Sequence, residues 1–91
     1  MDVQLLIGGE DMAAASRNTF ERANPVTGEL VTRSAAAGPE DAIRAADAAA
    51  AAFPAWSGLG PNARRRILLK AAEVLLSKMD EFKGLMAAET G

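Results

Sequence analysis

The chain has 91 residues, of which 10 are basic and 12 are acidic, and its formal net charge is −2. This balance provides no basic field, so we expect no nucleic-acid partner. The sequence contains no cysteine and no histidine. Their absence excludes a disulfide framework, a thiolate zinc site and the usual nucleophile–base pairs within these residues.

The sequence also gives no support for export or membrane insertion. An acidic residue at position 2 stands where a signal peptide carries basic ones. The longest uninterrupted apolar run, residues 48–53, is far shorter than the roughly 20 residues that a membrane-spanning helix needs. We therefore expect a soluble, cytoplasmic protein with no membrane partner.

A chain of this length forms one small domain at most, and it buries about 60–65% of the surface that its unfolded form exposes. The apolar fraction of 49% depends heavily on alanine, whose burial gains only about 1 kcal/mol per side chain. We therefore expect a thin core and marginal independent stability.

Three short strands are predicted in the first third of the chain, at about 4–7, 19–23 and 29–33. The last two flank a tight turn, in which Pro25 has the φ that the second turn position needs and Gly28 supplies a positive φ. Residues 10–18 are mostly small and polar, and we expect a surface connection there.

Helices are predicted at about 39–53, 61–77 and 80–89. Pro39 and Pro61 each suit a first helical position, because that position needs no N–H donor. Pro54 is expected to end or kink the first helix, since the residue before a proline avoids helical backbone.

The apolar faces of the first two helices differ in width. A narrow face with 3-4-3 spacing lies on the first helix: Ile43, Ala46, Ala50 and Phe53. A wider stripe lies on the second: Ile67, Leu68, Ala71, Ala72 and Leu75. We expect the narrow face to cover only part of the wide stripe, which leaves an apolar patch exposed.

Two short segments have the composition of phosphate-binding sites, and each has a simpler explanation. Gly58-Leu-Gly-Pro-Asn-Ala63 resembles the glycine-rich dinucleotide fingerprint, which requires a preceding strand. A predicted helix precedes it here, so we interpret it as a helix–helix connection. Arg64-Arg-Arg66 lies near a helix start, where anions bind. We interpret these arginines as a solvated face that pairs with nearby carboxylates.

Acidic residues occur in two pairs that have the right chemistry for general acid–base catalysis: Asp41 with Asp47, and Asp80 with Glu81. Their positions at helix starts or on solvated faces explain them without catalysis. Trp56 is interpreted as a side chain that anchors the loop rather than as a ligand platform. We therefore assign no catalytic, cofactor-binding or metal-binding residue within the chain.

Six fragments, taken in order, resemble the amino-terminal segment of the NAD(P)-dependent aldehyde dehydrogenase superfamily over essentially the whole chain. They are Leu5-Leu-Ile-Gly-Gly9, Asn24-Pro-Val-Thr-Gly-Glu29, Glu40-Asp-Ala-Ile-Arg-Ala-Ala46, Ala52-Phe-Pro-Ala-Trp-Ser57, Arg65-Arg-Ile-Leu-Leu-Lys-Ala-Ala72 and Glu89-Thr-Gly91. Thr19-Phe-Glu-Arg22, Pro25-Val26 and the triple arginine are most similar to a bacterial branch. That branch acts on aromatic aldehydes of the salicylaldehyde, benzaldehyde or vanillin type.

This resemblance implies a longer α/β protein with a Rossmann-type cofactor domain, a catalytic domain and an oligomerisation domain. It implies oxidation of an aldehyde to the carboxylic acid with NAD or NADP, through a cysteine thiohemiacetal and thioester. The catalytic and cofactor motifs are expected beyond residue 91, and the parent is expected to be a homodimer or homotetramer. A backbone-carbonyl cation site found in some relatives would fall at Arg22 and Ala23.

For residues 1–91 the resemblance implies a structural role, with the remainder of its own chain as the partner and an aldehyde as the substrate of the parent. A free-standing, non-catalytic helical interaction module is the alternative. Continuation of the reading frame beyond Gly91 distinguishes the two.

Overall fold

The computed structural model describes residues 1–91, which form five short strands followed by three helices. The strands are β1 (Asp2–Val3), β2 (Leu5–Ile7), β3 (Glu10–Met12), β4 (Thr19–Ala23) and β5 (Leu30–Ala35). The helices are α1 (Pro39–Ser57), α2 (Pro61–Ser77) and α3 (Met79–Thr90). This order confirms the expectation of an amino-terminal strand and hairpin region followed by two to three helices.

The strands form two separate sheets. In the larger sheet β5 is central, with β4 antiparallel on one side and β1 parallel on the other. The smaller sheet is the β2–β3 hairpin. Glu21 and Arg33 face each other across β4 and β5, and the Arg33 guanidinium donates to the Glu21 carboxylate from Nη2 at 2.8 Å and from Nε at 3.2 Å. This pairing raises the pKa of Arg33.

The turn between β4 and β5 follows from the Asn24 side chain and the backbone conformation of Gly28. The Asn24 Oδ1 atom accepts hydrogen bonds from the backbone N–H groups of Val26 at 2.8 Å and Thr27 at 3.3 Å. Gly28 has a φ of 77°, in the left-handed region that glycine adopts without steric cost. The Asn24 side chain therefore stabilises the turn locally, as asparagine commonly does.

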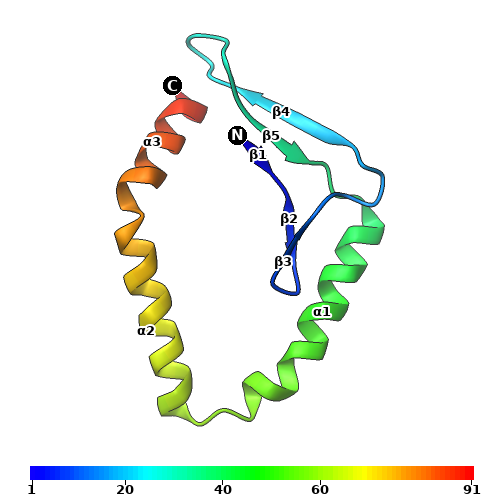
Figure 1. The fold of residues 1–91 in the computed structure, drawn as a ribbon, viewed down its shortest axis with the longest axis vertical. Helices are drawn as coiled ribbons and strands as arrows, with labels where there is room; N and C mark the ends of the chain where they lie inside the picture. The colour runs from blue at the N-terminus through cyan, green and yellow to red at the C-terminus, as the bar shows by residue number, and fades with distance from the viewer.

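The elements are arranged as an open, flat frame, with overall extents of 49 × 33 × 15 Å. Figure 1 shows the β4–β5 hairpin along one edge, α1 along a second, and α2 followed by α3 along a third. The carboxyl end of α3 returns to the β4–β5 hairpin, so the two ends of the chain lie near the same edge (Figure 1). Neighbouring elements along this frame meet mainly at their ends.

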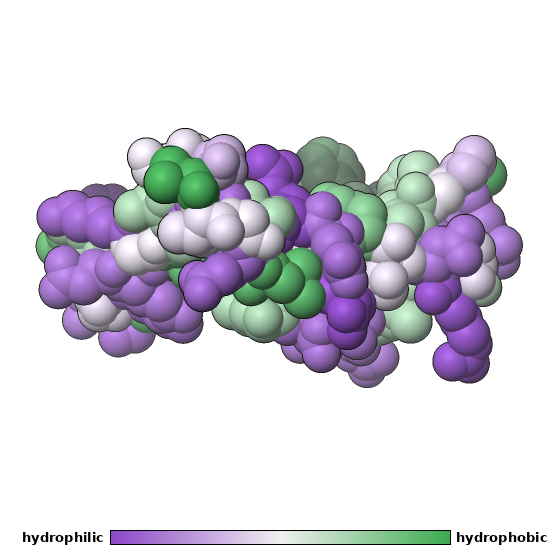
Figure 2. All heavy atoms as spheres, turned by 90° about the horizontal axis from the view of Figure 1, so that it is seen from above, coloured by the Kyte–Doolittle hydropathy of each residue, from purple (hydrophilic) through white to green (hydrophobic).

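The frame has almost no hydrophobic core. Only Ala14, Thr32 and Asp41 are buried, and two of these three are polar. Large apolar side chains are exposed on every helix, for example Phe53 at 64%, Leu76 at 65% and Met86 at 64%. Figure 2 shows hydrophobic residues among hydrophilic ones across the thin edge of the molecule.

The surface connection expected over residues 10–18 is wrong in its first part, because residues 10–12 form β3. Gly8 and Gly9 have φ values of 62° and 82°, the pair of positive angles that a two-residue type I′ hairpin turn requires. Ile7 and Glu10 then pair directly across the turn. The polar sequence Glu10-Asp11 gave no alternating apolar signal, so periodicity did not indicate this strand.

The expectation that the first helix ends near residue 53 is corrected, since α1 continues to Ser57 with Pro54 inside it. The alternative, that Pro54 kinks the helix, stays a prediction. Proline removes one helical N–H, and the cost is smallest near a helix end where few further bonds follow. The Pro54 carbonyl still accepts a hydrogen bond from the Gly58 N–H at 3.1 Å and one from the Ser57 hydroxyl at 3.2 Å. These bonds complete the last turn of α1.

The narrow face of α1 does not cover the stripe on α2, which corrects that expectation. The two helices diverge after Ser57 and lie along different edges of the frame (Figure 1). Ile43 is 62% exposed and Phe53 is 64% exposed. The inner neighbour of α1 is the β2–β3 hairpin, where a β-carbon built on Gly8 would lie 3.9 Å from the Cβ atom of Ala48.

We predict that the 91-residue chain alone is helical but does not unfold cooperatively. Its exposed apolar side chains offset little of the conformational entropy, roughly 1–2 kcal/mol per ordered residue, that folding costs. Circular dichroism should show a helical far-ultraviolet signal with a broad thermal transition, and a dye for apolar surface should bind strongly. A sharp, concentration-independent transition of a monomer would contradict this prediction.

Candidate functional site

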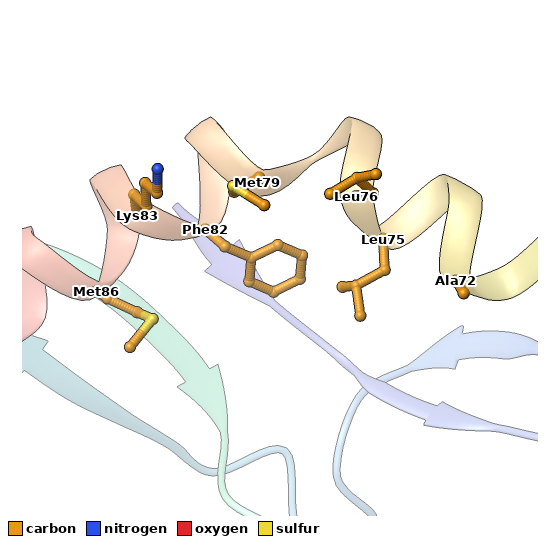
Figure 3. Close-up of a pocket in the computed structure, with 7 residues that line it drawn as sticks. All are labelled: Ala72, Leu75, Leu76, Met79, Phe82, Lys83 and Met86. Atoms are coloured by element: carbon orange, nitrogen blue, oxygen red, sulfur yellow. The ribbon is translucent and has the colours of Figure 1, made fainter.

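An apolar groove lies on α2 and α3. It encloses about 410 Å³ and is lined by Ala72, Leu75, Leu76, Met79, Phe82, Lys83 and Met86. Figure 3 shows Leu75, Phe82 and Met86 projecting from the same side of the two helices. Large flexible side chains and a single cation make this α2–α3 groove suited to another apolar protein surface.

A second groove, between α1 and the β2–β3 hairpin, has a different character. It encloses about 420 Å³ and is lined by Leu6, Ile7, Gly8, Gly9, Ala45, Ala48, Ala49 and Ala52. Small side chains allow the backbone of another element to approach closely. This α1–hairpin groove is therefore suited to tight packing rather than to the burial of large side chains.

A buried carboxylate joins α1 to the strand region. Asp41 is 2% exposed, and its two oxygens accept hydrogen bonds from the Gly38 N–H at 2.9 Å and the Ala15 N–H at 3.0 Å. The bond to Gly38 closes a capping box at the start of α1, and the bond to Ala15 crosses 26 residues of sequence. These backbone donors, Gly38 first and Ala15 second, lower the pKa of Asp41.

A second polar joint connects the end of α3 to the larger sheet. The Thr32 hydroxyl on β5 donates to Glu89 Oε1 at 3.2 Å, and Glu89 Oε2 lies 3.7 Å from Nε of Arg22 on β4. The neighbouring Gly91 lies against the β4–β5 turn. These contacts bring together residues that are 57 positions apart in the chain.

The glycine-rich segment at 58–63 connects α1 to α2, as the sequence interpretation held. Gly60 is the N-cap residue of α2, and its carbonyl accepts the Arg64 N–H at 3.1 Å. No strand precedes it, so the βα geometry that lets glycine backbone approach a pyrophosphate is missing. These residues do not fit a dinucleotide cofactor.

The arginines of Arg64-Arg-Arg66 do not pair with carboxylates, which corrects the sequence interpretation. The ion pairs of the structure are Arg22–Glu89, Arg33–Glu21 and Lys70–Glu73. Arg64 and Arg65 instead line a shallow surface hollow together with Trp56 and Pro61. Trp56 lies in the last turn of α1 and is 36% exposed.

The remaining sequence candidates occupy a helix cap or solvent-exposed positions. Asp47 is exposed on α1, whereas its proposed partner Asp41 is the buried capping residue. Asp80 and Glu81 occupy the first turn of α3 and are exposed. No three residues of the types that ligate metals through side chains lie close enough together to hold an ion. The three helices each fall short, in length or in apolar character, of what crossing a bilayer requires.

The carbonyl cation site that the resemblance placed at Arg22 and Ala23 stays a prediction. Both residues end β4, at the point where its pairing with β5 shifts register: Arg22 pairs with Thr32 and Ala23 with Leu30. This irregularity interrupts the regular ladder at the two residues concerned.

Comparison with known proteins gives a consistent result. A sequence model described as the aldehyde dehydrogenase family matches residues 12–91. The chain belongs to the aldehyde dehydrogenase family. A vanillin dehydrogenase of Pseudomonas fluorescens is 58% identical over 91 residues, which are 100% of this chain and 19% of that protein. A salicylaldehyde dehydrogenase of Pseudomonas putida is 45% identical, with 100% and 19% covered.

Solved structures agree with these sequence relatives. The crystal structure of a salicylaldehyde dehydrogenase from Pseudomonas putida G7, complexed with salicylaldehyde, superposes with a TM-score of 0.93 and 45% identity. The match covers 98% of this chain and 18% of that one. The chain thus spans about a fifth of the length of the relatives it matches. The resemblance seen in the sequence, including its aromatic-aldehyde branch, is confirmed.

Sequence reasoning missed both polar joints. Asp41 was interpreted only as a helix-start acid, although its position three residues after Gly38 is the spacing of a capping box. No sequence signal indicated Ala15 as its second donor. Thr32 and Glu89 carry no local pattern that links them, because their contact depends on the path of three helices.

We predict that Asp41→Asn lowers the helix content of α1 and weakens the dependence of that helix content on pH. The folded pKa lies below the usual 3.8, so the carboxylate stabilises the fold above that pH. This contribution is lost as the pH falls through the folded value. The amide of asparagine accepts through one oxygen only, so one backbone N–H loses its partner.

The measurement is far-ultraviolet circular dichroism of the chain between pH 2 and pH 7. The wild-type chain should lose helix content at the acidic end of this range. Asp41→Asn should have a lower helix content at pH 7 and should lose less of it on acidification. Asp47→Asn, at an exposed position of the same helix, is the matched control and should behave as wild type. Equal curves for Asp41→Asn and Asp47→Asn would contradict the assigned role of Asp41.

Proposed function

We propose that residues 1–91 are a structural segment of an aldehyde dehydrogenase that oxidises an aromatic aldehyde to its carboxylic acid. The whole enzyme would use NAD or NADP and a cysteine thiohemiacetal and thioester, with all of these groups held outside this segment. Vanillin and salicylaldehyde appear in the names of the relatives that are 58% and 45% identical, which supports an aromatic substrate. A 36% identical relative in Thermoplasma acidophilum is named as an NADP(+) enzyme.

One observation carries the structural role. The backbone of this chain follows 18% of the backbone of a solved salicylaldehyde dehydrogenase with a TM-score of 0.93, yet it buries only three of its own residues. A fold that is specified so closely, but leaves its apolar side chains uncovered, needs further protein to cover them. The α2–α3 groove and the α1–hairpin groove are the surfaces that the remainder of the same polypeptide would occupy.

The chemistry of the enzyme is not attributed to any residue of this chain. The glycine-rich connection between α1 and α2 does not fit a dinucleotide, so we derive no step of cofactor binding here. The substrate of the parent would be the aldehyde, and its assembly a homodimer or homotetramer in the cytoplasm.

An activity experiment tests this function. The purified 91-residue chain, incubated with vanillin and NAD, should produce no NADH above a control without protein, since it lacks a thiolate nucleophile. A chimera should be tested beside it, in which these residues replace the matching first fifth of the Pseudomonas fluorescens vanillin dehydrogenase. We expect the chimera to oxidise vanillin. Turnover by the chain alone, or a chimera that fails to assemble where the parent assembles, would contradict the proposal.

A substitution in the α2–α3 groove tests which surface is covered. In the chimera, Phe82→Ala should lower the free energy of unfolding by about 3–5 kcal/mol, the usual cost of removing a buried aromatic side chain. Val74 is 42% exposed on α2 and lies outside the groove. Val74→Ala is therefore the control and should change stability far less. Thermal denaturation of both variants gives the comparison, and equal losses would contradict coverage of the groove.

A further inference from the structure

We propose that Glu89, with Thr32, Arg22 and Gly91, forms a latch that holds the end of α3 against the β4–β5 hairpin and closes the frame. The latch is a property of the chain itself. The latch also affects the width of the frame, and so which part of the remaining polypeptide can pack against it. This consequence rests on the proposed function.

The first component is the bond between Thr32 and Glu89. Thr32 is 2% exposed, so its hydroxyl cannot exchange its partner for water. A buried hydroxyl without a partner is costly, and the carboxylate supplies a charged acceptor at 3.2 Å. Removal of Glu89 would therefore leave Thr32 buried and unsatisfied as well as detach the helix.

The second component is Arg22, which approaches the other oxygen of the same carboxylate. Its Nε atom lies 3.7 Å from Glu89 Oε2, and its side chain is 55% exposed. An ion pair at this exposure contributes little by itself. Together with Thr32 it fixes the carboxylate between β4 and β5, because each oxygen faces a different strand.

The third component is steric. Gly91 has a φ of 85°, and its N–H donates to the Ala87 carbonyl at 2.9 Å, which ends α3. A β-carbon at position 91 would lie 2.9 Å from Val26 Cγ2 and 3.2 Å from Pro25 Cγ. A side chain at residue 91 would therefore require Val26 or the end of α3 to move, and the positive φ would add strain.

These contacts form a latch because little else holds the α2–α3 arm in place. The Thr32 hydrogen bond and the Arg22 ion pair are the only such bonds that join α3 to the strands. Phe82 and Met86 project from α3 into the α2–α3 groove, so the direction of α3 places one wall of that groove (Figure 3). With the latch open, Phe82 and Met86 would lie at different distances from the strands.

Spin labels test the latch in a version of the chimera from which the other cysteines have been removed, because the 91-residue chain alone is not expected to hold a fixed tertiary structure. Residues 1–91 themselves contribute no cysteine. Labels at Glu29→Cys, beside the turn, and Asp80→Cys, in the first turn of α3, use exposed positions without hydrogen-bonded or ion-paired side chains. Pulsed electron resonance should give a defined distance peak for the closed frame. Glu89→Ala and Gly91→Ala should each abolish it, whereas Glu73→Gln, in an exposed pair with Lys70, should leave it unchanged. A peak that survives Glu89→Ala and Gly91→Ala, or is absent from the labelled, assembled chimera, would overturn the proposal.

A double-mutant cycle in the chimera tests the bond itself. Thr32→Val and Glu89→Ala should each accelerate amide exchange over residues 85–91 by roughly tenfold, the scale of a hydrogen bond to a charged group. The double variant should be no faster than Glu89→Ala alone, because that substitution already removes the bond to Thr32 together with the Arg22 ion pair. Additive effects would overturn the latch. Failure of the unsubstituted chimera to assemble would instead contradict the proposed function, whereas an assembled chimera that shows additive effects contradicts the latch alone.

Discussion

The near absence of a hydrophobic core is the constraint on which every other feature of this chain depends. Three residues are buried, and the two polar ones among them, Asp41 and Thr32, are each hydrogen-bonded to a distant part of the sequence. Apolar burial normally supplies the main favourable free energy of folding. Here the strand ladders, the helices and the two polar joints specify the path of the backbone, and the stability has to come from protein that covers the frame.

The two grooves, which further protein has to cover, differ in the size of the side chains that line them. The α1–hairpin groove is lined largely by alanine and glycine, so most of its apolar area is backbone and Cβ atoms. Contact there gains little area per residue but permits close packing. The α2–α3 groove offers leucine, methionine and phenylalanine, which carry a larger area per side chain. Two surfaces lined by side chains of such different size suit two different elements of a partner rather than one repeated contact.

The sequence specified the local structure well wherever a short-range signal decides it. Pro39 and Pro61 mark the first residues of α1 and α2, and Gly28 has the positive φ that the turn needs. The β3 strand was missed because its polar residues follow a turn that two glycines determine. The arrangement of α1 and α2 was wrong for a different reason. Amphipathic patterns show that a face is apolar but not which element covers it, and here the cover lies outside these residues.

The polar joints also bear on the choice between a structural segment and a free-standing interaction module. A module that folds alone would need its large apolar side chains turned inward, but Leu75, Leu76 and Phe82 are about half exposed or more. The Asp41 joint orders the start of α1, and the Glu89 joint returns α3 to the sheet, yet neither covers those side chains. Specific long-range polar contacts around an uncovered apolar surface are what a segment shows when its own bonds give it shape and a larger body gives it stability. That combination, together with a backbone that matches one part of a much longer aldehyde dehydrogenase, favours the structural role.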